Sequence, residues 1–145
     1  MFKKLLLVCV GNICRSPTAE ILFRQRLHGR AGVEVASAGL HALAGHPIDP
    51  TAAALLCEQG HDPSAHRARQ ATPSILGAAD LILVMERAHL AQIAREVPQV
   101  SGKTFLLGRW DDIEVPDPYR QQRFAFEHVY GLMEQGAARW ANYIS

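Results

Sequence analysis

Short runs of apolar residues alternate along this chain with longer segments in which apolar residues recur every three or four positions. The short runs are typical of strands buried on both faces. They predict strands at residues 5–10, 33–38, 81–85 and 104–107. The longer segments are typical of helices packed on one side. They predict helices at residues 16–29, 49–60, 90–97 and 126–144, and a short helical turn opening at residue 72.

Proline placed directly after a capping residue marks the start of several of these elements. Ser16-Pro17, Asp49-Pro50 and Thr72-Pro73 each join an oxygen-bearing side chain to a proline. The first residue of each pair is suited to the N-cap, and the proline is suited to the first helical position. We therefore expect helices to begin at all three pairs.

Strands that alternate with helices imply a parallel sheet covered by helices on both faces. We therefore expect residues 1–145 to form a single α/β domain of the doubly wound, flavodoxin-like kind, with a four-stranded parallel sheet. In such sheets, ligands bind beyond the carboxyl ends of the strands. The loop after the first strand is therefore the first candidate for a binding site.

The overall charge gives no reason to expect nucleic acid as a partner. Lysine and arginine together number 15 and aspartate and glutamate 14, so any anion site has to be built locally. The apolar run near the N-terminus has six residues, which is shorter than the core of a secretory signal. No stretch approaches the roughly 20 apolar residues that span a bilayer. We expect a cytoplasmic protein that does not insert into a membrane.

The cysteines and histidines do not suggest a disulfide framework or a metal site. The three cysteines are Cys9, Cys14 and Cys57, and an odd number in an apparently cytosolic chain argues against structural disulfides. Cys57 falls in an apolar helical segment, where we expect a buried small side chain. The histidines are scattered without the spacing of metal ligands.

Cys9 and Arg15 enclose five residues directly after the first predicted strand. A loop of this length can curl so that its backbone N–H groups point at one oxyanion, and the following helix adds a partial positive charge there. Arg15 offers a planar, charged fork that matches two phosphoryl oxygens. We expect the enclosed residues to bind a phosphoryl group; they are Val10, Gly11, Asn12, Ile13 and Cys14.

The same positive field favours the thiolate form of Cys9, which is the nucleophilic form of a cysteine. Ser16 is placed to donate a hydrogen bond to that thiolate. Attack on phosphorus would form a cysteinyl phosphate, which divides one hard hydrolysis into two easier steps. The alternative interpretation is a buried cysteine in an ordinary tight turn beside an exposed arginine. The loop lacks the lysine and the second glycine of a nucleotide-binding G-x-x-x-x-G-K-[ST] segment.

Two motifs near opposite ends of the chain resemble the low-molecular-weight protein tyrosine phosphatases. Residues 8–20, VCVGNICRSPTAE, are similar to the phosphate-binding signature of that family, and Asp117-Pro118-Tyr119 is similar to the segment that carries its general acid. The resemblance implies hydrolysis of protein phosphotyrosine to tyrosine and inorganic phosphate, without a cofactor. It also implies that Cys9 and Arg15 act together with Asp117.

The residues alone leave the role of Asp117 open. Asp-Pro pairs often cap turns, so a structural role is equally consistent with this position. Other carboxylates in the same loop are weaker candidates for the acid; they are Asp111, Asp112 and Glu114.

The resemblance further implies two apolar walls for the aromatic ring of the substrate. One wall is Tyr119, and the other comes from the loop after the second strand, where this chain has Leu40. Where relatives often carry a second aromatic residue after the tyrosine, this chain has Arg120. These features resemble the bacterial branch that dephosphorylates the tyrosine kinases of capsule and exopolysaccharide export. A bacterial tyrosine kinase is therefore the expected protein partner.

By the same resemblance, Asn12, Ser37 and His66 form a hydrogen-bond network that supports the phosphate loop. The alternative for His66 is a half-exposed loop histidine. The resemblance also implies that Cys9 and Cys14 form a reversible disulfide that protects the nucleophile. The alternative for Cys14 is a small apolar residue that fills space behind the loop.

Two other functions compete with phosphatase activity. A thiol-dependent arsenate reductase uses a similar fold and anion loop, but it needs further cysteines to relay a disulfide, and Cys57 is the one cysteine outside the loop. A non-catalytic phosphotyrosine-binding module would use the same anion loop. Binding alone, however, requires neither the nucleophile nor the acid.

Overall fold

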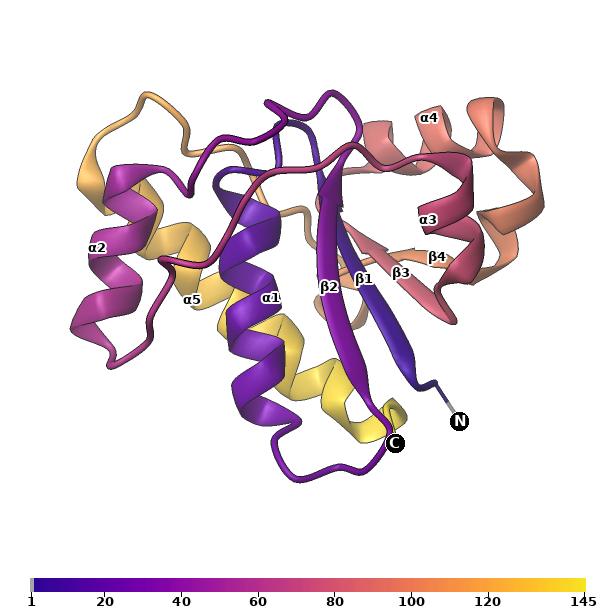
Figure 1. Cartoon of the computed structure of the whole chain (residues 1–145), viewed down its shortest axis with the longest axis horizontal. Helices are drawn as coiled ribbons and strands as arrows, with labels where there is room; N and C mark the ends of the chain where they lie inside the picture. Colours follow the sequence, from indigo (N-terminus) through magenta and orange to yellow (C-terminus); the bar gives the residue numbers. More distant parts are fainter. Residues whose placement is uncertain (1) are drawn as a thin grey trace.

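The computed structural model describes residues 2–145, which fold into a single α/β domain (Figure 1). The strands are β1 Lys4–Cys9, β2 Glu34–Gly39, β3 Leu81–Val84 and β4 Thr104–Leu106. The α-helices are α1 Arg15–Arg26, α2 Pro50–Glu58, α3 Pro73–Ala78, α4 Arg87–Glu96 and α5 Arg123–Trp140. Short 3-10 helices are η1 Pro98–Lys103, η2 Arg109–Asp111 and η3 Ala141–Tyr143. The predicted strands and helices are confirmed, with ends that differ by a few residues.

The sheet formed within residues 2–145 has four parallel strands in the order β2-β1-β3-β4. The chain winds from β1 to β2 in one direction and then crosses to β3 on the other side of β1. This arrangement confirms the predicted doubly wound sheet. The reversal places the carboxyl end of β1 at the point where such folds bind ligands.

Alternate residues of β1 belong to two separate cores. Leu5 and Leu7 pack with apolar side chains of α1, α2 and α5. Leu6 and Val8 pack with side chains of α3 and α4 on the opposite face. Helices cover both faces of the sheet (Figure 1), and these four side chains are at most 3% exposed. The double burial explains why β1 is an unbroken apolar run in the sequence.

Two of the three predicted helix caps are confirmed. The Asp49 carboxylate accepts hydrogen bonds from the backbone N–H groups of Thr51 and Ala52, at 2.9 and 3.2 Å. The hydroxyl of Thr72 accepts from the N–H of Ile75 at 3.2 Å. The prediction for Ser16 was wrong.

The first helix begins one residue earlier than Ser16. α1 starts at Arg15, and Cys14 occupies the N-cap without a side-chain capping bond. The hydroxyl of Ser16 is instead in contact with Cys9 and Asn12, 2.9 and 2.7 Å away. Ser16 therefore faces the loop before the helix rather than the free N–H groups at its end.

The prediction that Cys57 is buried was also wrong, because its side chain is exposed. α2 buries Ala52, Leu55 and Leu56 against the core. Successive helical residues are rotated by about 100°, so Cys57 falls outside this buried stripe.

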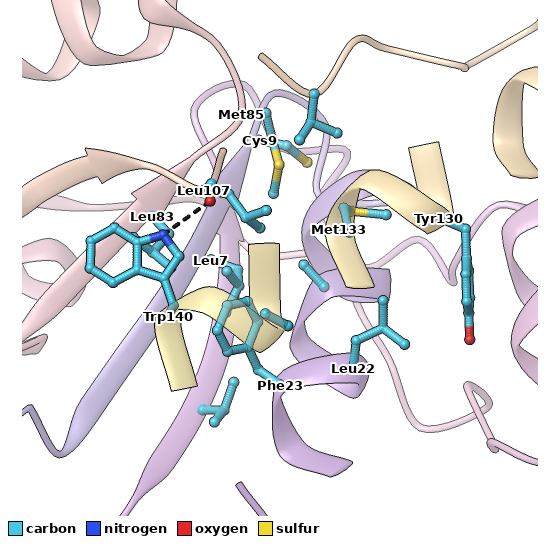
Figure 2. Close-up of a cluster of buried hydrophobic side chains, with 14 of the residues drawn as sticks. Leu7, Cys9, Leu22, Phe23, Leu83, Met85, Leu107, Tyr130, Met133 and Trp140 are labelled. Carbon is cyan, nitrogen blue, oxygen red and sulfur yellow. Dashed lines mark hydrogen bonds between the residues drawn. The ribbon is translucent and has the colours of Figure 1, made fainter. Parts of the chain in front are cut away.

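A glycine in α5 allows that helix to pack closely against the end of β4. A Cβ atom at Gly136 would lie 3.0 Å from the carbonyl oxygen of Leu107 and would clash with its Cδ2. One turn further along, the indole N–H of Trp140 donates to the same carbonyl oxygen at 3.0 Å (Figure 2). The close approach joins the C-terminal helix to the sheet. Within residues 2–145, no helix combines the length and apolar character needed to cross a membrane.

The two glycines of α5 should respond to alanine in opposite directions. Gly136→Ala should lower the free energy of unfolding by about 1–3 kcal/mol, because the added methyl group overpacks against Leu107. Gly131→Ala should raise it by about 0.5–1 kcal/mol, because no atom lies within 4 Å of the new Cβ and alanine favours the helix. Urea unfolding of both variants measures the difference, and stabilisation by both would contradict this packing.

Candidate active site

A hollow of about 210 Å³ opens at the carboxyl end of β1. Its floor is the loop between β1 and α1, and its sides come from the loops after β2 and β4. The lining residues are Cys9, Val10, Gly11, Ile13, Cys14, Arg15, His41, Leu43, Asp117 and Tyr119. The structure therefore brings the predicted nucleophile, arginine and acid together from opposite ends of the sequence.

Asn12 holds the floor loop in shape from within the protein. Its backbone is in the left-handed region, with φ of 58°, and its side chain is fully buried. The side-chain N–H group donates to the hydroxyls of Ser16 and Ser37, at 2.7 and 3.0 Å. The side-chain oxygen accepts from the backbone N–H of Arg69 at 2.9 Å. Because both ends of this amide are bonded, the unusual backbone conformation is fixed.

Further contacts extend this support to neighbouring elements. The imidazole Nε2 of His66 lies 2.7 Å from the carbonyl oxygen of Asn12. Ser37 donates to the carboxylate of Glu20 at 2.6 Å. The three residues expected to support the loop therefore meet in space. Glu20 is the last residue of the sequence motif, but it was not predicted as a member of this network. Its contact with Ser37 arises because α1 directs the Glu20 side chain back towards β2.

The thiol of Cys9 is nearly buried, and Ser16 contacts it twice. The Sγ atom lies 2.9 Å from the Ser16 hydroxyl and 3.4 Å from the Ser16 backbone nitrogen, which donates to it. Asn12 already donates to that hydroxyl, so the serine proton can go to sulfur at 2.9 Å or to the carbonyl oxygen of Ala38 at 3.4 Å, and the shorter distance favours sulfur. Ser16 therefore places two polar groups against the Cys9 sulfur.

The guanidinium of Arg15 is fixed before any ligand binds. Arg15 is 2% exposed, and its Nη1 donates to the Glu86 carboxylate at 2.6 Å and to the carbonyl oxygen of Val115 at 2.9 Å. Its Nη2 lies 3.9 Å from the Asp117 carboxylate. Both hydrogen bonds use Nη1, and Arg15 remains part of the lining of the hollow. No local pattern in the sequence marks Glu86 as a site residue.

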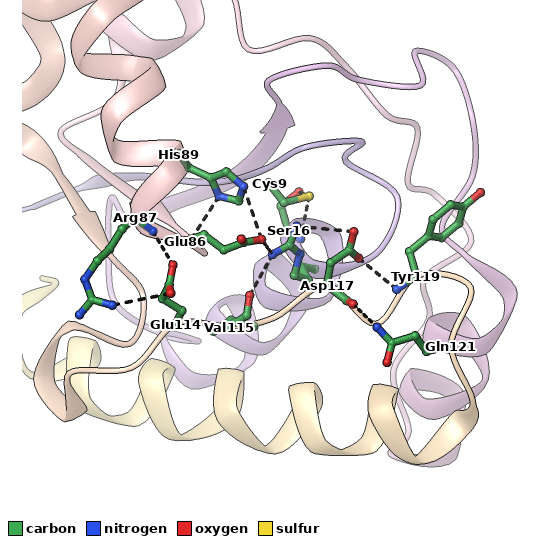
Figure 3. A network of polar contacts seen from close by, with 11 residues as sticks. Cys9, Ser16, Glu86, Arg87, His89, Glu114, Val115, Asp117, Tyr119 and Gln121 are labelled. Carbon is green, nitrogen blue, oxygen red and sulfur yellow. Dashed lines mark hydrogen bonds and ion pairs between the residues drawn. The ribbon is translucent and has the colours of Figure 1, made fainter.

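His89 supports Glu86 from behind. The Nδ1 atom of His89 accepts a hydrogen bond from the Glu86 backbone N–H at 3.2 Å, and its Nε2 lies 3.7 Å from the Glu86 carboxylate (Figure 3). Burial lowers the pKa of His89 below its ordinary value, and the positive charge of Arg15 lowers it further. Nearby carboxylates act in the opposite direction; they are Glu86, Glu114 and Asp117. A neutral His89 with its hydrogen on Nε2 satisfies both contacts.

Asp117 is held at the mouth of the hollow by its own turn. One carboxylate oxygen accepts from the backbone N–H of Tyr119 at 3.0 Å, and the Gln121 side chain donates to the Asp117 carbonyl oxygen at 2.9 Å (Figure 3). The other carboxylates of this loop have different partners. Asp111 pairs with Arg139, and Asp112 and Glu114 bond to Arg87. Of these four carboxylates, Asp117 alone lines the hollow.

The second wall of the hollow differs from the prediction. Tyr119 lines one side, but Leu40 is 6% exposed and packs in the core beneath α3 and α4. The loop after β2 runs beside the floor loop, with backbone bonds such as Leu43 N–H to Gly11 oxygen at 3.0 Å. This pairing directs His41 and Leu43 into the hollow instead.

Cys14 lies in the lining but differs in character from Cys9. It is buried and free of any disulfide. Burial raises the pKa of the Cys14 thiol, and the negative charges of Asp49, Cys9 and Asp117 raise it further, against the opposing effect of Arg15. The raised pKa keeps Cys14 in its thiol form. Among residues 2–145, no three His, Cys, Asp or Glu side chains are grouped as metal ligands would be.

Comparison with known proteins gives a consistent result. Residues 4–145 match the family model described as low molecular weight phosphotyrosine protein phosphatase. The chain is 47% identical over 145 residues to the Escherichia coli K12 low molecular weight protein-tyrosine-phosphatase Etp, covering 99% of this chain and 96% of the relative. The structure of the Erwinia amylovora tyrosine phosphatase AmsI is similar with a TM-score of 0.93 and 44% identity, covering 100% and 95%. Vibrio vulnificus Wzb in complex with benzylphosphonate is similar with a TM-score of 0.92 and 40% identity, covering 99% of each chain.

The lowered pKa of His89 predicts a loss of stability in acid. Below the unfolded-chain pKa of about 6.5, the unfolded protein takes up a proton that the folded protein does not, so stability falls as pH decreases towards the lower folded pKa. The contribution of this one proton is at most about 1.4 kcal/mol per pH unit.

His89→Gln removes the titration while keeping a side chain that can accept from the Glu86 N–H, as in a capping box. Urea unfolding between pH 7.5 and 5 should therefore show a shallower decline for the variant than for the wild type. Parallel pH curves would show that His89 is protonated equally in both states.

Proposed function

Because this chain belongs to the low molecular weight phosphotyrosine protein phosphatase family, we propose that it hydrolyses protein phosphotyrosine through a phosphorylated Cys9. The observation that carries the proposal is the meeting of three groups in one hollow: the Cys9 thiol with its two Ser16 donors, the fixed guanidinium of Arg15, and the Asp117 carboxylate. Nucleophile, anion-binding group and acid are what transfer of a phosphoryl group to a thiol requires.

In the first step, the phosphoryl group of the substrate lies in the loop of residues 9–15. The Cys9 thiolate attacks phosphorus and the bond to the tyrosine oxygen breaks. Arg15 and the backbone N–H groups of the loop stabilise the charge spread over the equatorial oxygens. Asp117, as a carboxylic acid, gives its proton to the departing phenolate oxygen.

In the second step, water attacks the cysteinyl phosphate. Asp117, now a carboxylate, accepts a proton from the water, and inorganic phosphate forms as the S–P bond breaks. The electron pair returns to the sulfur of Cys9, where the Ser16 hydroxyl and N–H stabilise the thiolate as a leaving group. No cofactor takes part in either step.

The walls of the hollow support an aromatic substrate. Tyr119 and Leu43 both line it and are partly exposed, 38% and 41% respectively, so their apolar surface is available to a ring. An aromatic ring between such side chains buries apolar surface that a phosphoserine side chain does not offer. The similar Wzb structure contains benzylphosphonate, an aryl-bearing phosphate analogue.

The proposed substrate is a phosphorylated bacterial tyrosine kinase of exopolysaccharide export, acted on in the cytoplasm. The support is the similarity to the bacterial phosphatases Etp and Wzb over nearly the whole chain. The unpaired state of all three cysteines is consistent with a reducing compartment.

The two competing functions have less support. A reductase relay through Cys57 is disfavoured because that cysteine lies on α2 and does not line the hollow. A binding module would leave the contacts between Ser16 and Cys9 without a purpose.

Hydrolysis of p-nitrophenyl phosphate in the presence of a chelator tests the proposed roles. Cys9→Ser should abolish turnover, because a serine hydroxyl is a far weaker nucleophile at neutral pH. Asp117→Asn should lower kcat by about 10²–10⁴-fold, the usual contribution of a general acid and base.

Asp112→Asn is the matched control for Asp117→Asn. It removes an exposed carboxylate from the same loop that is bonded to Arg87 outside the hollow, and it should leave kcat within about twofold. Activity retained by Cys9→Ser, or an equal loss in both aspartate variants, would contradict the proposed mechanism.

The difference between the two loop cysteines predicts their order of oxidation. Peroxide should oxidise the Cys9 thiolate to a sulfenic acid, which condenses with the Cys14 thiol to a disulfide and releases water. Wild type should recover activity after treatment with dithiothreitol, whereas Cys14→Ser should progress to irreversible sulfinic acid at Cys9. Peptide mass spectrometry identifies both products. Over-oxidised Cys9 without a disulfide in the wild type would contradict this prediction.

A further inference from the structure

Arg120 has a left-handed backbone conformation, which glycine adopts more readily than any other residue. It directly follows the wall residue Tyr119, and its φ is 62°. The left-handed region brings the Cβ of an ordinary residue too close to the following carbonyl oxygen. A bulky residue that remains in such a conformation beside a binding site is reason to look for a function of its side chain.

The guanidinium of Arg120 lies over the ring of Tyr119. Its Cζ atom is 5.3 Å from the ring centroid, a cation–π geometry. Tyr119 lines the hollow and Arg120 does not. The positive charge is therefore placed beside the entrance and outside the lining of the hollow.

No carboxylate neutralises this charge within residues 2–145. Arg120 takes part in none of the ion pairs or side-chain hydrogen bonds that these residues form. Arg123, three residues later, differs in this respect, because it pairs with Glu58 at 2.6 Å and with Glu127 at 3.1 Å. Arg120 is thus an exposed cation that the aromatic ring of Tyr119 positions and no acidic side chain satisfies.

We propose that Arg120 forms an anion-binding subsite at the entrance, which binds the carboxylate of an acidic side chain next to the phosphotyrosine in the substrate protein. The proposal rests on the proposed function, because it places the phosphotyrosine ring against Tyr119. Neighbouring Cα atoms of a peptide are about 3.8 Å apart. An acidic side chain one or two positions from the phosphotyrosine can therefore reach past the Tyr119 ring to Arg120. Arginine suits this role because its planar fork matches a carboxylate while its face rests on an aromatic ring.

Two phosphotyrosine peptides that differ only in the charge of their two flanking residues test the subsite. One carries Glu on both sides of the phosphotyrosine, and the other carries the neutral isostere Gln. For the wild type, kcat/KM should favour the Glu peptide by about two- to fivefold at low salt, as for an exposed ion pair. The preference should decrease towards one as salt screens the pair.

Substitutions at Arg120 should change the preference in a graded order. Arg120→Lys should retain part of it, Arg120→Gln should reduce the ratio to one, and Arg120→Glu should invert it. Arg26→Gln is the matched control, because it removes the same charge from an exposed position in the last turn of α1, away from the hollow. A wild-type ratio of one, or a ratio unchanged in Arg120→Gln, would overturn the proposal.

Binding measurements separate this proposal from the catalytic one. The affinities of the Cys9→Ser protein for the two peptides should show the same preference and the same dependence on Arg120. If wild type hydrolyses neither peptide nor p-nitrophenyl phosphate, the proposed function fails, and the binding ratio still decides the role of Arg120.

Discussion

Burying the charge of an arginine is tolerated only where the protein replaces the water that the guanidinium has lost, and the position of Arg15 depends on this condition. Removing such an ion from water costs several kcal/mol even after relaxation. Glu86 and the carbonyl oxygen of Val115 offset this cost through one nitrogen of the guanidinium. Glu86 follows β3 and Val115 lies in the loop after β4, while Arg15 starts the helix after β1. The position of one cation therefore depends on three parallel strands ending at the same edge of the sheet.

The proposed mechanism requires a phosphoryl group to meet a loop that is already in shape, and the contacts of the loop of residues 9–15 are consistent with this. Asn12 is bonded through its side-chain amide and its backbone oxygen to four residues, which lie in α1, in β2 and in the loop between α2 and α3. These contacts hold a left-handed residue that would otherwise be unfavourable. Donors fixed in advance do not need to reorganise when charge develops on phosphorus, which is the main way that such sites stabilise transition states. The same loop keeps the thiol of Cys9 next to the donors of Ser16.

The sequence predicted the parts of the protein that depend on local signals. Apolar runs located the strands, and the Asp49 and Thr72 caps located two helices, because each signal acts over only a few residues. The contacts of Glu86 and His89 could not be predicted in this way. Glu86 stands between a strand and a helix, where a charged residue is common and signals no special role. Its partner Arg15 is 71 positions away in the sequence. Leu40 was assigned to the wrong side of its loop because the direction of a loop side chain depends on the neighbouring segment that it pairs with. Side-chain partners brought together by the sheet are thus the part that required the structure.

The most direct test of the account is to trap the phosphorylated enzyme. The Asp117→Asn protein is mixed with excess p-nitrophenyl phosphate, quenched in acid within the first turnover, digested and examined by mass spectrometry. The account predicts one phosphoryl group on the peptide that contains Cys9 and Cys14, with fragmentation placing it on Cys9, and none on the same peptide from Cys9→Ser. A phosphoryl group on a histidine or carboxylate, or rapid release of p-nitrophenol without any phosphorylated Cys9, would contradict it.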